Sequence, residues 1–217
     1  MKRLCLKDPG SAITHLIGII MAILGGFSLF VFAFRKVDAL SQISIFVYWL
    51  SMVLLYTSST LYHALNLSEI GNRRLKKMDH LMIFVLIAGT YTPICLISLR
   101  GTVGFLLLAI IWSFALIGML VKAFWIFCPK WFSSLLYIAM GWTCLIAFPR
   151  LLQALPVSAF LWLLSGGIIY TIGGILYALK LSVFDNKHPY FGSHEIFHLF
   201  VMGGSLCHLF VMYEIVS

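Results

Sequence analysis

The chain has 217 residues, of which 62% are hydrophobic and only 10% are charged, and its mean hydropathy is +1.03. This composition excludes an ordinary soluble domain, in which about a quarter of the residues are charged, and predicts a polytopic membrane protein. A formal charge of +8 would suggest nucleic-acid binding in a soluble protein. Here the basic residues fall mostly in short connections, where they orient a chain in the bilayer, so we expect no nucleic-acid partner.

About 20 apolar residues cross a bilayer as a helix, and the sequence contains seven such runs. We expect spans near residues 12–34, 42–63, 80–99, 103–125, 132–149, 157–179 and 194–216. The first run follows a basic N-terminus but is too long for the apolar core of a signal peptide, so we interpret it as a retained span. Without an internal repeat or a long loop, residues 1–217 are predicted to form one all-α, seven-helix membrane domain.

Lys and Arg are distributed unevenly between the two sides of these predicted spans. The side opposite the N-terminus holds only Arg35, Lys36, Arg100 and Arg150. The side of the N-terminus holds Lys2, Arg3, Lys7, Arg73, Arg74, Lys76, Lys77, Lys122, Lys130, Lys180 and Lys187. Because basic residues favour the cytoplasmic side, the sequence predicts a cytoplasmic N-terminus and an external C-terminus.

A pair of histidines, His194 and His198, lies at the start of the last apolar run. Residues four apart share one face of a helix, which allows both imidazoles to bind a single metal ion. A lone histidine is more often a packing or helix-bridging residue. Two histidines in hydrocarbon are costly, however, unless they meet a partner or a cavity, and this cost favours the metal hypothesis.

Other polar residues are predicted at the same depth as this pair. His15 begins the first span, His63 ends the second and Asp79 precedes the third, so all lie toward the predicted cytoplasmic face. His63, His194 and His198 would fill three tetrahedral positions of Zn²⁺ and leave the fourth for water or substrate. Iron, cobalt or nickel is also compatible with an all-nitrogen ligand set.

Two further residues are candidates for catalysis at this site. Asp79 would act as a general base toward a metal-bound water or would orient a ligand imidazole, and Ser59, one turn from His63, would bind the water or an oxyanion. Alternatively, Asp79 simply starts the third helix, where a carboxylate favours the helix dipole. We expect His80 and His188 to face the lipid headgroups and Glu195 to pair with an interfacial base or a polar group of the bundle.

At these residues the chain resembles the hemolysin III proteins, the bacterial branch of the progestin and adipoQ receptor family, which includes the adiponectin receptors. The resemblance covers nearly the whole chain. Its specific parts are Ser59-x3-His63 followed by Asp79, His194-x3-His198 within residues 192–198, and Thr-Tyr-Thr-Pro at residues 90–93. The first family motif is partly present, at residues 8–15, with Ser11 in the place of an asparagine, which leaves the role of His15 open.

The resemblance implies a seven-helix bundle with a cytoplasmic N-terminus and a zinc site near the cytoplasmic face. The implied ligands are His63, His194 and His198, with a water between zinc and Asp79 and with Ser59 nearby. Eukaryotic members of the family act as receptors, and some are linked to ceramide hydrolysis. Bacterial members carry a haemolysin name and are connected with membrane lipid state.

The leading hypothesis from the sequence is a zinc-dependent intramembrane hydrolase in a bacterial plasma membrane. Its substrate would be a lipid amide or ester that enters from the bilayer. The first alternative is a non-enzymatic sensor of a lipid or small ligand in which zinc is structural. The second is a cytolytic protein, although the chain shows no amphipathic strands that could line a pore. An ion channel is the least favoured reading, because acidic residues deep in the spans are scarce.

Overall fold

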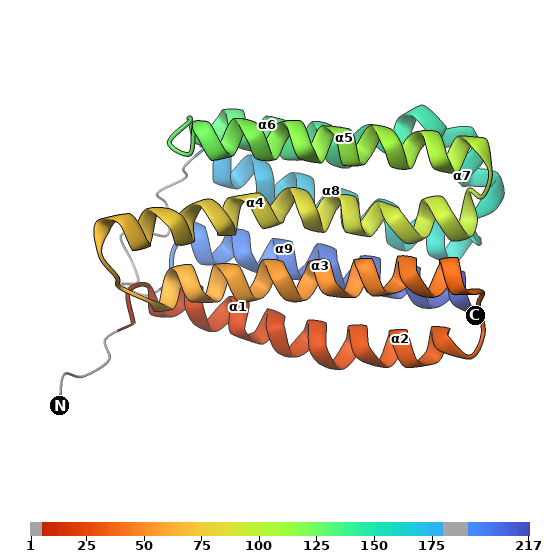
Figure 1. The fold of residues 1–217 in the computed structure, drawn as a ribbon, viewed down its shortest axis with the longest axis horizontal. Helices are drawn as coiled ribbons and strands as arrows, with labels where there is room; N and C mark the ends of the chain where they lie inside the picture. The colour runs from red at the N-terminus through yellow and green to blue at the C-terminus, as the bar shows by residue number, and fades with distance from the viewer. Residues whose placement is uncertain (1–5, 180–190) are drawn as a thin grey trace.

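The computed structural model describes residues 6–179 and 191–217, and every regular element in these two stretches is helical. Seven helical segments there are long and apolar enough to cross a membrane. They are Pro9–Phe34, Ala39–Ala64, Glu69–Ser98, Thr102–Phe124, Lys130–Ala154, Val157–Leu179 and Ser193–Val216. The prediction of an all-α, seven-helix, multi-pass membrane protein is confirmed (Figure 1).

Four of the spans are single helices, and three are built from shorter helical pieces. The single helices are α3 (Ala39–Ala64), α5 (Thr102–Phe124), α8 (Val157–Leu179) and α9 (Ser193–Val216). The composite spans are α1 (Pro9–Met21), η1 (Ala22–Gly26) and α2 (Phe27–Phe34); α4 (Glu69–Pro93) and η2 (Ile94–Ser98); and α6 (Lys130–Gly141), η3 (Trp142–Ala147) and α7 (Phe148–Ala154). The segments η1 and η2 are π-type turns, and η3 is a 3₁₀ turn.

The third span begins eleven residues before the predicted start at residue 80. Ser68 caps α4 by accepting a hydrogen bond from the Gly71 amide at 3.3 Å, and Glu69 follows in the first turn, where a carboxylate is favourable. The first turns of α4 are therefore a polar helical extension that an apolar-length criterion cannot detect. They project beyond the neighbouring helices in Figure 1.

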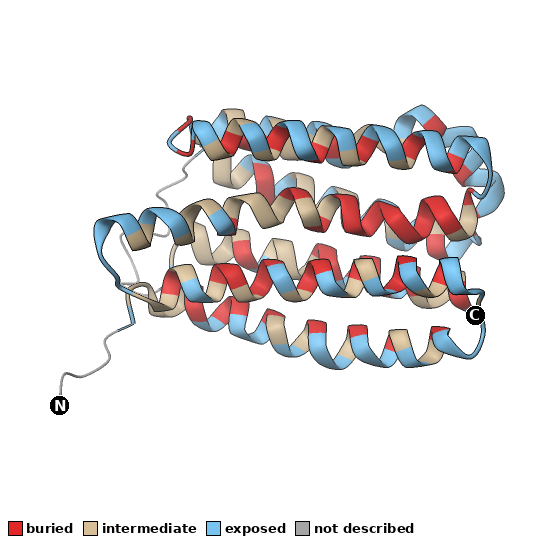
Figure 2. Cartoon of the chain, viewed as in Figure 1, coloured by how far each residue is buried: buried red, intermediate tan, exposed pale blue. Residues whose placement is uncertain are grey.

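Polar and apolar side chains are arranged as a lipid environment requires. Figure 2 shows buried residues concentrated along α4 and on the inward faces of its neighbours. Large apolar side chains such as Leu24, Phe124 and Val157 are exposed on the outside. In a membrane this outer surface contacts acyl chains, so it requires no partner protein to cover it.

Close packing of α8 against α9 fixes the position of the helix that carries the histidine pair. A Cβ atom on Gly173 would lie 2.6 Å from the Cβ of Phe200, and one on Gly204 would lie 2.8 Å from the ring of Tyr170. Only glycine permits this approach, in agreement with the packing role of small residues between membrane helices. The α8–α9 seam therefore holds α9 rigidly along the bundle.

The start of α1 and the C-terminal Ser217 lie at opposite ends of the bundle (Figure 1). We call the end that holds the start of α1, the end of α3 and the start of α9 the histidine end. That this end faces the cytoplasm stays a prediction. Lys2, Arg3, Lys180, Lys187 and His188, to which the sequence assigned topogenic or headgroup-facing roles, lie outside the described residues.

Candidate metal centre

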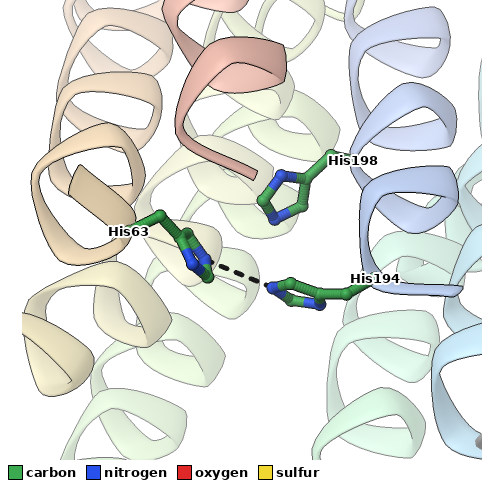
Figure 3. Close-up of side chains that lie close together, drawn as sticks. All are labelled: His63, His194 and His198. Carbon is green, nitrogen blue, oxygen red and sulfur yellow. Dashed lines mark hydrogen bonds between the residues drawn. The ribbon is translucent and has the colours of Figure 1, made fainter. Parts of the chain in front are cut away.

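Three histidines from two helices converge at the histidine end. His63 lies in the last turn of α3, and His194 and His198 lie one turn apart at the start of α9. Each ring offers one nitrogen such that the three atoms lie within 4.8 Å of one another. Figure 3 shows the rings directed toward a common point, with the Nε2 atoms of His63 and His194 3.2 Å apart.

The three imidazoles fit a metal ion in ligand type and in spacing. With Zn–N distances of about 2.0–2.1 Å, two ligands of a tetrahedral ion stand about 3.4 Å apart. The separation of 3.2 Å between His63 and His194 is close to this value. His63 and His198 are 4% and 2% exposed, so the group is shielded from bulk solvent. This buried group of three histidines can hold a metal ion.

The outer nitrogens of two of these rings have partners on the N-terminal segment, residues 7–15. His63 Nδ1 lies 3.1 Å from a carboxylate oxygen of Asp8, and His198 Nδ1 lies 3.1 Å from the Thr14 hydroxyl. Carboxylate and hydroxyl partners of this kind commonly orient metal-binding imidazoles. No role was predicted for Asp8 or Thr14. Their only signal was their place in the partial first motif, beside His15.

Asp79 is buried at the histidine end, as the predicted depth requires. Its carboxylate lies 3.2 Å from His80 Nδ1, which also lies 2.9 Å from the Lys76 carbonyl. The prediction that His80 faces the headgroups is wrong, because its side chain is only 12% exposed and pairs with Asp79. A histidine beside an acid at the start of an apolar run is equally compatible with either orientation, so the sequence could not decide between them.

Ser59 lies on the same face of α3 as His63, one turn deeper. It interacts with Asp79, which interacts electrostatically with His63 as well. The Ser59 hydroxyl is nevertheless buried and meets no partner in full hydrogen-bond geometry within the described residues. The structure thus brings Ser59 and Asp79 together beside the histidines, and their catalytic roles stay predictions.

His15 joins this cluster but is not one of the three converging rings. It stacks on His198 with ring centroids 3.6 Å apart and an interplanar angle of 16°, and its edge meets Tyr56. Both of its nitrogens are buried and lack a hydrogen-bond partner among the described residues. The predicted common depth of His15, His63 and the α9 pair is therefore matched by direct ring contacts, and Asp79 lines the same cavity as His15 and the α9 pair.

Glu195 connects the start of α9 to the start of α1. One carboxylate oxygen accepts a hydrogen bond from the Ser11 hydroxyl, and the other accepts from the Gly192 amide at 2.8 Å. The expectation that Glu195 pairs with a polar group of the bundle is confirmed. Ser11, which replaces asparagine in the first motif, thus serves as a link between these two helices.

A cavity of about 190 Å³ opens from this cluster into the bundle. Asp79, His194 and His198 line its polar end, and Leu151, Phe148 and Phe160 line its far end. The walls between these ends are overwhelmingly apolar. The cavity therefore suits an amphiphile whose polar group lies beside the histidines and whose hydrocarbon lies along the bundle.

Comparison with known proteins places this geometry in a family. The family model described as haemolysin-III related matches residues 4–209. The chain is 40% identical over 204 residues to the hemolysin-3 homolog of Bacillus subtilis, which covers 94% of this chain and 92% of that protein.

Two other relatives are similar over most of this chain. The hemolysin-3 of Bacillus cereus is 39% identical over 205 residues, covering 94% of this chain and 90% of that protein. The adiponectin receptor protein of Drosophila melanogaster is 23% identical over 238 residues, covering 93% of this chain and 49% of that protein. With the family model and both Bacillus proteins matching nearly end to end, the chain belongs to the haemolysin-III-related family of membrane proteins.

Proposed function

We propose that this protein is a zinc-dependent intramembrane hydrolase that cleaves an amide or ester bond of a membrane lipid, in the manner of a ceramidase, and thereby contributes to membrane lipid homeostasis. The observation that carries the proposal is a buried group of three histidines at the head of an apolar cavity, with a carboxylate and a hydroxyl beside it. Polar groups at membrane depth are costly, and they commonly mark functional sites.

His63, His194 and His198 would hold the ion and leave a fourth position, as catalytic zinc sites do. A bound zinc ion supplies a Lewis acid that polarises a carbonyl oxygen and makes a water molecule nucleophilic near neutral pH. All three candidate ligands are nitrogen donors, which suits zinc better than a hard cation such as Mg²⁺.

The remaining steps belong to side chains of this chain. Asp79 would accept a proton from the attacking water and return it to the leaving amine or alcohol. The Ser59 hydroxyl, which meets no partner in full hydrogen-bond geometry within the described residues, would donate to the carbonyl oxygen as negative charge develops there. The C–N or C–O bond breaks, the hydroxyl of water remains on the acyl carbon, and the products are a fatty acid and an amine or alcohol.

The apolar cavity supports a lipid as the substrate. Its far end, at Phe148 and Phe160, is lined by apolar side chains, and none of the described residues there offers a charged group to a polar ligand. Moving an acyl chain from the bilayer into this part of the cavity costs little free energy, because both environments are apolar. The membrane itself is then the source of the partner, and the plasma membrane of a bacterium is the location suggested by the two Bacillus relatives.

One observation favours a second function, a non-enzymatic sensor of a lipid or small ligand with a structural metal. The Asp79 carboxylate lies 3.2 Å from His80 Nδ1, as expected of a residue with a structural role rather than a catalytic one. A third candidate, cytolysis, rests only on the names of the two Bacillus relatives. Purified protein that lyses liposomes directly would favour it.

The experiment compares wild type with Asp79→Asn in nanodiscs. Metal content is measured by mass spectrometry, and hydrolysis is followed with a fluorescent lipid amide and its ester analogue. We expect about one zinc per chain in both proteins, with turnover in wild type and a loss of about 10²–10⁴-fold in Asp79→Asn. Zinc without turnover in wild type would favour the sensor, and a zinc-free, well-folded wild type would overturn both metal-based functions.

A further inference from the structure

The N-terminal segment, residues 7–15, contacts two of the three converging histidines on the ring side that faces away from the cluster. We propose that Asp8 and Thr14 are positioning residues that fix His63 and His198 in the tautomer with a free Nε2 lone pair, so that two of the three metal ligands are preset before metal arrives. This inference rests on the metal site of the proposed function.

The hydrogen bonds of Thr14 determine the tautomer of His198. The Thr14 hydroxyl donates its one hydrogen to the Ser11 carbonyl at 2.9 Å. It can therefore only accept from His198 Nδ1, which lies 3.1 Å away. His198 Nδ1 must carry the ring proton, which leaves a lone pair on Nε2. Figure 3 shows the other ring nitrogen of His198 directed toward His63 and His194.

Asp8 acts in the same way on His63. An ionised carboxylate only accepts hydrogen bonds, and Asp8 is half-exposed, with the Lys7 ammonium 3.8 Å away. His63 Nδ1, 3.1 Å from that carboxylate, therefore donates, and in the neutral ring this leaves Nε2 with its lone pair. Asp8 precedes α1, but its side chain makes no capping hydrogen bond, so its contact with His63 is separate from helix capping.

His194 is the ligand that must change. Its Nε2 lies 3.2 Å from His63 Nε2. With both rings neutral and the His63 proton on Nδ1, His194 Nε2 carries a proton in the metal-free chain and donates it to His63. A cation between the two rings requires that proton to move to Nδ1, which is buried without a partner among the described residues. The reorganisation on metal binding is thus confined to one of the three rings.

The backbone holds Asp8 and Thr14 in register with the histidines. The Asp8 amide donates to the His63 carbonyl at 2.8 Å, and Lys7 Nζ donates to the Tyr62 carbonyl at 3.1 Å. On the other side, Ser11 is linked to Glu195 of α9. The segment is therefore fastened to both helices that supply the ligands, which allows it to set ring orientation precisely enough to affect metal affinity.

The test measures zinc affinity by competition with a chromophoric chelator in detergent-solubilised protein. Thr14→Val keeps the shape but removes the hydroxyl, whereas Thr14→Ser keeps the hydroxyl. We expect Thr14→Val and Asp8→Ala each to weaken zinc binding by about 10- to 100-fold and Thr14→Ser to bind like wild type. Ser11→Ala is the structural control, because it loosens the segment by breaking the link to Glu195 but removes no partner of a ring nitrogen, so it should weaken zinc binding less than Thr14→Val does.

Imidazole ¹⁵N NMR of the metal-free protein reads the tautomers directly. We expect His63 and His198 to be protonated at Nδ1 and His194 at Nε2, with only His194 changing on zinc addition. Equal affinity of Thr14→Val and Thr14→Ser, a loss in Ser11→Ala as large as in Thr14→Val, or protonation of His198 at Nε2 would each overturn the inference. Wild type that binds no zinc would instead overturn the proposed function, and the NMR spectrum would still decide the tautomers.

Discussion

The two ends of the bundle differ in how far their charged and titratable side chains are buried. At the far end from the histidines, Asp38 and Arg100 form an ion pair whose side chains are about half-exposed, and both also contact Ser41. At the histidine end, His63, His198 and Asp79 are nearly fully buried. The exposed Asp38–Arg100 pair needs no functional explanation, because exposed ion pairs form and break at little cost in free energy.

At the histidine end, burial raises the free-energy cost of polar side chains. Imidazoles and a carboxylate removed from water need partners, and at this end the Nε2 atoms of His63 and His194 are paired with each other at 3.2 Å rather than with an oxygen atom. Such an arrangement is stabilising only if something else satisfies it, and a bound cation is the simplest candidate. The difference between the ends therefore indicates where this chain gives up stability for function.

The largest expected effect separates two histidines of the same helix. His194→Ala should lower zinc affinity by more than the roughly 10- to 100-fold expected for loss of an outer partner, because it removes a ligand of the proposed site. His208→Ala is the matched control, since His208 is buried on α9 but packs against Gly166. Zinc titration of both variants makes the comparison. Equal losses would mean that burial of a histidine, and not its place at the histidine end, determines zinc binding.

An intermediate effect is expected from packing at the opposite end. A Cβ on Gly104 would collide with the carbonyl oxygen of Cys95 and lie 3.0 Å from that of Leu99. Gly104→Ala should therefore lower the free energy of unfolding by about 1–3 kcal/mol while zinc stoichiometry stays unchanged. Unfolding in mixed micelles measures the first quantity and mass spectrometry the second.

Gly141→Ala is the control for this substitution, because a Cβ there meets nothing within 4 Å. We expect its stability to differ from wild type by no more than about 0.5 kcal/mol. Loss of zinc in Gly104→Ala would show that packing at this end affects zinc binding at the histidine end, and the two ends would then not be independent.

The smallest effect is expected from the exposed ion pair. The Ser41 backbone amide, followed by the Arg100 guanidinium, holds the pKa of Asp38 below its ordinary value of 3.8. A lowered pKa in the folded state stabilises the fold above pH 3.8, and this contribution is lost as the pH falls through the folded pKa. Asp38→Asn should be slightly less stable than wild type near neutral pH, and the difference should vanish in acid.

Thermal unfolding of the metal-free proteins across the acid range measures this difference without interference from zinc release. A difference in thermal stability between wild type and Asp38→Asn that grows on acidification would contradict the expected loss of this contribution in acid.

The number of spans was predictable because bilayer thickness fixes the length of an apolar helix. The convergence of His63, His194 and His198 was predictable as well, since helical spacing places two on one face and topology gives the depth of the third. The start of α4 was missed, because its first turns are polar and its cap at Ser68 carries no apolar signal.

The contacts of Asp8 and Thr14 could not be predicted for a different reason. Depth along the membrane normal follows from the position in a span, but the rotation of α1 about its own axis depends on its packing against α3 and α9. Thr14 is one of several hydroxyl residues that could have faced His198, and the sequence does not distinguish among them.

Figure 1 shows that the first and last spans, which carry the N-terminal segment and the histidine pair, are neighbours in the bundle. His63 and His194 are 131 residues apart in the chain. At about 5–20 residues per second, a ribosome reaches His194 roughly 7–26 s after His63. By then six of the seven spans have been synthesised, but two of the three imidazoles are still missing. Insertion of the seventh span is thus the step that assembles the three-histidine group.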